Sequence, residues 1–293
     1  MLGKLIKHEW KSTYKICGAL LLFLVVMTGL ATISFKTPMW GVLFAEKQKS
    51  GFVPTPLDFA GLMSLLFYVL SMVGVIWAII IYLGVHFYKT MYSEEGYLTH
   101  TLPVTSHQLL CSKILTAGIW YLIVLLVMIL SIFCLAFALI GTAFHASTEG
   151  MNLWKVLAEH WDEIAAEFHK NFRFSMMGNV AVYAAMLIFG SFTSVTSLFG
   201  AVTVGQLFGK HKVMMSIVSY FGISMITNVI TSIVSMPVTI SSTRKMFENP
   251  SSQVNLNLSG IPSSLISIAV SVAVAVILYF ISNYIITKKL NLD

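Results

Sequence analysis

Charged residues are scarce in this sequence. They make up 10% of the 293 residues, while 57% are hydrophobic, and an average soluble domain carries about 25% charged residues. The deficit is concentrated in several apolar runs of about 18 residues or more, a length that indicates membrane spans. An ordinary water-soluble domain is therefore excluded. The three cysteines form no C-x-x-C pair, so neither a disulfide framework nor a zinc site is indicated.

Motifs for nucleotide binding and catalysis are also missing. In the closest match to the phosphate-binding motif G-x-x-x-x-G-K-[ST], Val204 replaces the first glycine and no hydroxyl residue follows Lys210. No H-E-x-x-H metal motif and no Ser/His/Asp set at one depth is visible. We therefore expect no enzymatic activity, metal or cofactor on this chain. The net charge of +6 is spread along the sequence, and no basic block with interleaved aromatics indicates a nucleic-acid partner.

The apolar runs predict an all-α membrane protein with one domain over residues 1–293. A bilayer core needs about 20 helical residues, and the six predicted spans are 16–35, 59–88, 114–144, 177–208, 213–235 and 263–286. Their interiors contain no Asp, Glu, Lys or Arg. That argues against a carrier driven by an ion gradient, because such a protein usually needs an ionisable residue at depth.

The distribution of Lys and Arg predicts that both termini are cytoplasmic. The N-terminus, the C-terminal tail and the two loops on their side hold 10 of these residues in 51 positions. The other three loops hold 8 in 82 positions. Cytoplasmic segments carry the excess of positive residues, so the denser side is assigned to the cytoplasm.

Residues 1–15 predict an amphipathic elbow helix ahead of the first span. Leu2, Leu5, Ile6 and Trp10 recur at helical spacing, with lysines mostly elsewhere around the helix. Such a helix lies among lipid headgroups, with its lysines on the anionic cytoplasmic leaflet. A signal peptide is the competing interpretation, but the apolar run is too long and no cleavage site follows it.

Two further patterns concern the remaining segments. Residues 145–176 predict a second amphipathic helix, on the outer side.

In the fifth span, uncharged polar residues recur at helical intervals: Ser216, Tyr220, Ser224, Asn228 and Thr231. This stripe is typical either of a polar conduit wall or of hydrogen bonding between helices, which contributes about 0.6 kcal/mol per contact. The second interpretation is the commoner one, and both remain open.

The segment 89–113, between spans two and three, is the densest mixture of charge, turn residues and aromatic residues. Ser93 is a candidate cap for a short helix through Glu94 and Glu95, and Gly96 is a natural stop. Thr105 and Gln108 match the capping-box pattern, with Thr105 as N-cap and Gln108 at N3. This pattern predicts a helix that begins after Thr105 and continues into span three. We expect a shaped cytoplasmic loop that contacts a partner; a surface loop without a partner is the alternative.

The start LIKHEWKST, the six spans and the segment FYKTMYSEEGYLTHTLPVTSHQLLCSKIL resemble the membrane subunit of bacterial ABC-2 type transporters. The most specific part is E-G-Y-L…T-L-P-V…Q-L-L…K, which begins at Glu95 and ends at Lys113. The larger helical outer loop at 145–176 departs from the short connection expected in that family.

The resemblance implies a permease in the bacterial plasma membrane, driven by a separate ABC ATPase subunit that holds ATP and Mg²⁺. It implies that residues 89–113 are the coupling element, with these candidate contacts: Glu94, Glu95, Gly96, Tyr97, Leu98, Leu102 and Pro103. It also implies two permease copies, identical or homologous, around a central pathway, and mostly outward transport. Aromatic content favours an amphipathic, lipid-like or peptide cargo.

Two other functions remain as alternatives. One is a membrane scaffold or sensor that binds a cytosolic partner through residues 89–113 and moves nothing. The other is a secondary carrier or channel that works without nucleotide hydrolysis.

Overall fold

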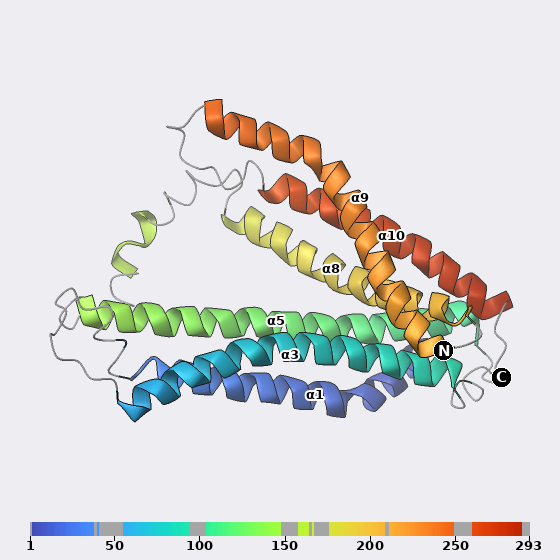
Figure 1. Ribbon diagram of the computed structural model, residues 1–293, viewed down its shortest axis with the longest axis horizontal. Coiled ribbons are helices and arrows are strands. Elements are labelled where there is room, and N and C mark those ends of the chain that lie inside the picture. Colours follow the sequence, from blue (N-terminus) through green and yellow to red (C-terminus); the bar gives the residue numbers. More distant parts are fainter. Residues whose placement is uncertain are drawn as a thin grey trace. The chain divides into compact units, whose positions relative to one another are not determined.

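The computed structural model describes residues 2–37, 40, 55–93, 96, 104–147, 158–163, 166, 176–208, 211–248 and 260–288, and these contain no β-strand. Six helices in this part of the chain are long and apolar enough to cross a membrane. They are α1 (Leu2–Ser34), α3 (Pro56–Tyr92), α5 (Ser106–Ser147), α8 (Met176–Gly205), α9 (Lys212–Glu248) and α10 (Gly260–Lys288) (Figure 1). The predicted all-α, multi-pass architecture is confirmed.

Several helices are longer than the predicted spans. At about 1.5 Å per residue, the 37 residues of α3 extend about 55 Å, against a hydrocarbon core of about 30 Å. The helix α1 has no break between the predicted elbow and the predicted first span. A single glycine such as Gly18 costs a helix only about 1 kcal/mol relative to alanine, so nothing in this stretch ends it.

The helix α9 continues past the predicted end of span five at residue 235. Pro237 lies inside it, and the helix runs on to Glu248. Proline removes one backbone hydrogen bond, but membrane helices tolerate it where other groups satisfy the freed carbonyl. Figure 1 shows α9 changing direction part-way along, and proline is a usual cause of such a bend.

Side chains that precede α3 and α5 fix where these helices begin. Thr55 donates both its backbone N–H (2.8 Å) and its hydroxyl (2.7 Å) to the buried carboxylate of Asp58. Pro56 follows as the first helical residue, where its missing N–H costs nothing. At α5, the backbone N–H of Gln108 donates to Thr105 Oγ1 at 3.4 Å, so the predicted N-cap at Thr105 is confirmed.

The chain divides into two compact units, and α1, α3 and α5 contribute to both. The smaller unit comprises Thr13–Ile79 and Ile123–Ile164. Within it, Ser131 Oγ of α5 lies 2.8 Å from Thr28 Oγ1 of α1 and 2.6 Å from Tyr68 Oη of α3. One hydroxyl therefore joins three helices, and these hydrogen bonds satisfy all three polar side chains inside the bilayer.

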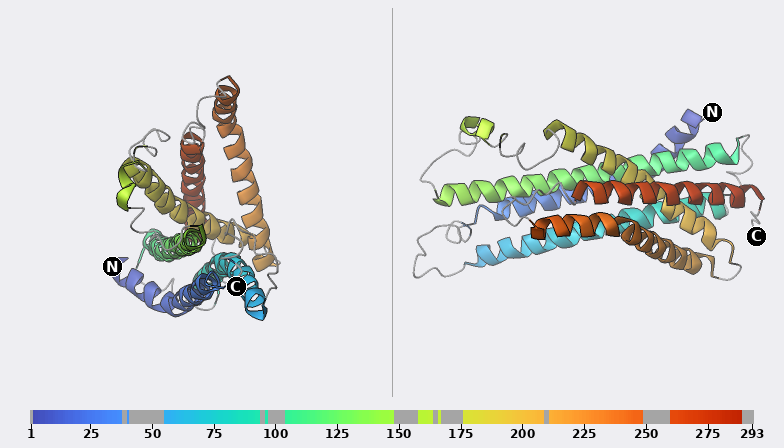
Figure 2. Two further views of the ribbon diagram at one scale, coloured as in Figure 1. Left: turned by 90° about the vertical axis from the view of Figure 1, so that its left-hand side faces the viewer. Right: turned by 90° about the horizontal axis from the view of Figure 1, so that it is seen from above.

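The larger unit comprises Met1–Ser12, Ile80–Leu122 and Ala165–Asp293. Within it, α8 packs against both α9 and α10, as Figures 1 and 2 show. Glycines permit the close approach: a Cβ at Gly200 would lie 2.9 Å from Leu278 of α10, and one at Gly205 would collide with Ser216 of α9. The end of α3 also packs on α8, where the Phe87 and Phe199 rings stack with centroids 4.0 Å apart.

Candidate functional site

A partly buried ion cluster joins three helix ends of the larger unit. Glu9, on the first turns of α1, places Oε1 2.5 Å from Lys113 Nζ and Oε2 3.1 Å from His86 Nε2. His86 belongs to the last turns of α3, and Lys113 to the first turns of α5. The residues are 77 and 104 positions apart from Glu9, so only the folded chain brings them together.

Lys113 is the most deeply buried member of this cluster. Its side chain is 3% exposed, against 15% for Glu9. The ammonium also donates to Thr90 Oγ1 at 2.7 Å, and that hydroxyl donates to the His86 carbonyl at 2.8 Å. A buried ammonium is tolerated only when it is paired and hydrogen-bonded, and Glu9 and Thr90 meet both conditions.

An aromatic pair lies beside the ion cluster. The rings of Trp10 and Trp120 stack with centroids 4.5 Å apart and an interplanar angle of 22°. Since Trp10 follows Glu9 directly, two consecutive residues of α1 contact the rest of the larger unit. Together they fix the position and rotation of the first turns of α1.

Glu9 was not among the site residues predicted from the sequence. In the sequence it stands on a helix rich in lysine, where a carboxylate is usually solvated. The helical spacing indicated that Glu9 lies on the apolar face. It comes four residues after Leu5 and three after Ile6, so the three residues share one face. Lys4, Lys7 and Lys11 are exposed, whereas Leu5, Ile6 and Glu9 are partly buried.

Of the seven residues predicted to contact an ATPase, only Gly96 is described. It is buried, and its N–H donates to Ser93 O at 2.7 Å. A Cβ at this position would lie 2.6 Å from the Met91 carbonyl oxygen, so this position requires glycine. The others lie outside the described residues: Glu94, Glu95, Tyr97, Leu98, Leu102 and Pro103.

Ser93 bonds to the helix before it, while the short helix that it was predicted to cap, through Glu94 and Glu95, lies outside the described residues. The Ser93 hydroxyl donates to the Lys89 carbonyl at 2.8 Å, which satisfies an acceptor in the last turn of α3. Serine readily bonds back to the carbonyl four residues earlier. Here α3 extends to Tyr92, beyond the predicted span end at residue 88, and Ser93 follows that helix end.

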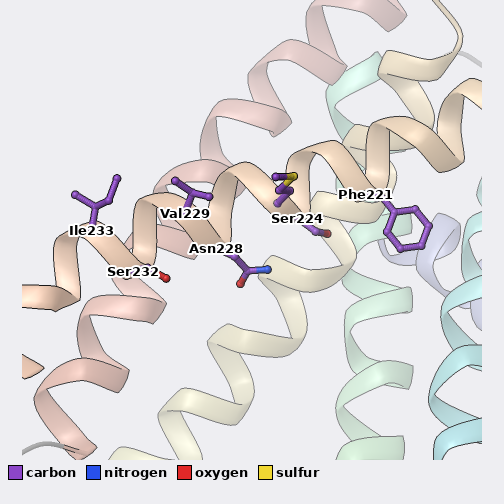
Figure 3. A pocket seen from close by; sticks show the side chains of 7 residues that line it. Phe221, Ser224, Asn228, Val229, Ser232 and Ile233 are labelled. Carbon is purple, nitrogen blue, oxygen red and sulfur yellow. The ribbon is translucent and has the colours of Figure 1, made fainter.

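The predicted polar stripe on α9 divides into two parts. Ser216 is buried, donates to Lys212 O at 2.9 Å and lies 3.3 Å from Val202 O of α8, so it belongs to a helix contact. Ser224 and Asn228 instead line an open hollow of about 510 Å³ on the surface of α9, with Phe221 and Ser232 (Figure 3). Asn228 is exposed. A role of this hollow in a pathway stays a prediction, as it does for Tyr220 and Thr231.

Comparison of the chain with protein families, characterised proteins and solved structures found no match. Within the described ranges, no three His, Cys, Asp or Glu side chains are grouped as metal ligands. The ion cluster contains one carboxylate, one imidazole and an ammonium, and the ammonium cannot ligate a cation. What this cluster can do is join the start of α1 to both helices that flank residues 93–105.

Proposed function

We propose that this chain is the membrane subunit of an ABC-2 type transporter, driven by a separate ATPase that docks on the segment 89–113. Its cargo would be an amphipathic, lipid-like or peptide molecule moved outward across the bacterial plasma membrane. Both termini would face the cytoplasm. A second permease copy, identical or homologous, would complete the pathway.

The ion cluster is the observation that carries this proposal. His86 and Thr90 lie just before the loop 93–105, and Lys113 lies just after it, on α5. Because Glu9 binds both sides at 2.5 and 3.1 Å, a displacement of the loop would act on α1, α3 and α5 together. This is the connection that a membrane subunit needs if its energy source is external.

The start of α5 supports the same mechanism. The Thr105 cap begins a helix that runs without interruption from Ser106 to Ser147. At Gly96 the Met91 backbone leaves no room for a side chain. Because the membrane helix α5 begins directly after residues 93–105, a protein docked on this segment could push on that helix.

A second candidate function is a carrier coupled to an ion gradient. The predicted spans contain no Asp, Glu, Lys or Arg, but α1 and α5 extend beyond those spans and bring Glu9 and Lys113 into contact. Buried ionisable residues in membrane proteins often mark proton or ion paths. The cluster lies near helix ends and its charges are paired, so we rank this function second.

Affinity purification of the full chain from its native membrane separates the candidates. Under the leading proposal, an ATPase of the cassette type co-purifies with the chain. Its association falls at least tenfold in Glu94→Lys/Glu95→Lys or Leu102→Asp variants and persists in the matched surface variant Lys7→Glu. A carrier would show gradient-driven flux in liposomes without ATP. A scaffold would retain a partner that hydrolyses no nucleotide.

A further inference from the structure

A second hollow lies between the end of α3 and the first turns of α9. Its volume is about 680 Å³, and it is lined by Tyr88, His211, Lys212, Val213, Met214 and Ile217. All six residues belong to the larger unit. It is separate from the ion cluster, with which it shares no lining residue.

The lining divides into a cationic part and an apolar part. His211 is exposed and Lys212 is partly exposed, and neither side chain pairs with a carboxylate among the residues that the structure describes. Next along the helix come three exposed apolar side chains, Val213 (54%), Met214 (67%) and Ile217 (55%). A positive end and a bare apolar wall therefore occur in one hollow.

The backbone at His211 holds this arrangement in place. Its φ is 63°, the only positive φ of a non-glycine residue in the described part of the chain. Its carbonyl accepts the Met215 N–H at 3.0 Å. His211 therefore forms the turn into α9 and lies next to Lys212 at the rim of the hollow.

These features define the chemistry of the ligand. Two cationic or ionisable groups without an acid favour an anion, and three exposed apolar side chains favour a hydrocarbon chain. A soluble anion would leave the apolar wall bare. The candidate membrane span of α9 also begins at Lys212, which is where lipid headgroups meet a membrane helix.

We propose that this hollow binds an anionic phospholipid. The phosphate lies beside Lys212 and His211, and an acyl chain follows Val213, Met214 and Ile217 along α9. The proposal goes beyond the proposed function and does not depend on it, since a transporter subunit, a carrier and a scaffold would each present the same hollow to lipid.

Native mass spectrometry of the full chain in a neutral detergent tests the proposal. Phosphatidylglycerol and phosphatidylcholine with identical acyl chains are titrated separately. We expect tighter binding of phosphatidylglycerol, a loss of about fivefold in its affinity in Lys212→Gln, which removes one positive charge, and a smaller loss in His211→Asn, which removes the imidazole. The variants are Lys212→Gln and His211→Asn, because asparagine tolerates a positive φ. Lys212→Arg retains the affinity, and in Lys212→Gln phosphatidylcholine, whose choline cation offsets the phosphate charge, loses less affinity than phosphatidylglycerol.

The matched control is Lys7→Gln, which removes one exposed positive charge outside the hollow. It should leave phosphatidylglycerol affinity unchanged. Equal weakening by Lys7→Gln would indicate general charge attraction and overturn the proposal, as would equal binding of the two lipids. Binding of inorganic phosphate in the absence of lipid, at matched ionic strength, would indicate a site for a soluble anion and would also overturn the proposal. Unfolding temperatures without added lipid verify that each variant is folded.

Discussion

The ammonium of Lys113 lies 2.5 Å from a carboxylate oxygen of Glu9, although 104 positions separate the two residues. The same carboxylate contacts His86 through its other oxygen at 3.1 Å. One side chain of α1 thus binds the two helices that residues 93–105 connect in the sequence.

Glu9→Gln should destabilise the larger unit by about 3 kcal/mol or more, because removal of one partner leaves a buried charge uncompensated. Lys113 is 3% exposed and cannot reach water without moving. Lys113→Met should cost less, since methionine fills much of the same volume without a charge. Unfolding of the purified chain in mixed micelles measures both values.

The double variant Glu9→Gln/Lys113→Met provides the internal control. Its cost should be smaller than the sum of the two single costs, because the second change removes the charge that the first left unpaired. Lys7→Met, at an exposed position of the same helix, should change stability by less than about 0.5 kcal/mol. Additive costs would show that Glu9 and Lys113 do not act as a pair.

Gly205→Ala should destabilise the contact between α8 and α9. The new Cβ would lie 2.5 Å from the Ser216 Cα, and backbone cannot move away as a flexible side chain can. Overpacking of this kind costs about 1–3 kcal/mol. The control is Gly190→Ala on the same helix, where no atom lies within 4 Å; it should be neutral or slightly stabilising. Equal effects of the two changes in thermal unfolding would contradict the packing described.

The membrane helices were predictable because their signal is local. Each needs only a run of about 20 apolar residues, and all six predicted spans lie within or largely overlap observed helices. The Thr105 cap was equally local, since the capping residue and the donor it satisfies are three positions apart. Helix ends were less predictable: Pro237 does not end α9, and α3 extends past residue 88 to Tyr92.

The ion cluster could not be predicted from local patterns. Glu9, His86 and Lys113 come from three separate segments, and each has an ordinary local interpretation. A carboxylate among lysines resembles a solvated helix face, and a lysine at the start of a span resembles a topology signal. Only the position of Glu9 on the same helix face as Leu5 and Ile6 indicated that it points toward protein.

Gly96→Ala should weaken association with the proposed ATPase subunit at least tenfold. A Cβ there would lie 2.6 Å from the Met91 carbonyl oxygen and 2.7 Å from its carbon, so the backbone at Gly96 must move. Gly222→Ala is the matched control, because no atom lies within 4 Å of a Cβ at Gly222. Co-purification from membranes measures both. Unchanged association in Gly96→Ala would mean that this position plays no part in docking.

Asn228→Leu should alter transport and leave both stability and ATPase association unchanged. The amide is exposed and lines the hollow on α9, so its loss removes a polar group from that surface without breaking a buried contact. Thr227→Val, on the same turn, is the control, because the Thr227 hydroxyl donates to its own helix at Ile223 O. Equal loss of transport and of ATPase association would instead indicate a packing role for Asn228.

A photo-crosslinking amino acid at position 97, in place of Tyr97 in the full chain, tests the central claim most directly. Irradiation of intact cells should yield a covalent adduct with a cytosolic ATPase of the cassette type, and the adduct should disappear in Glu94→Lys/Glu95→Lys. Crosslinks from position 97 only to molecules outside the cell would contradict the account. So would transport of the cargo by the purified chain with no nucleotide-hydrolysing partner.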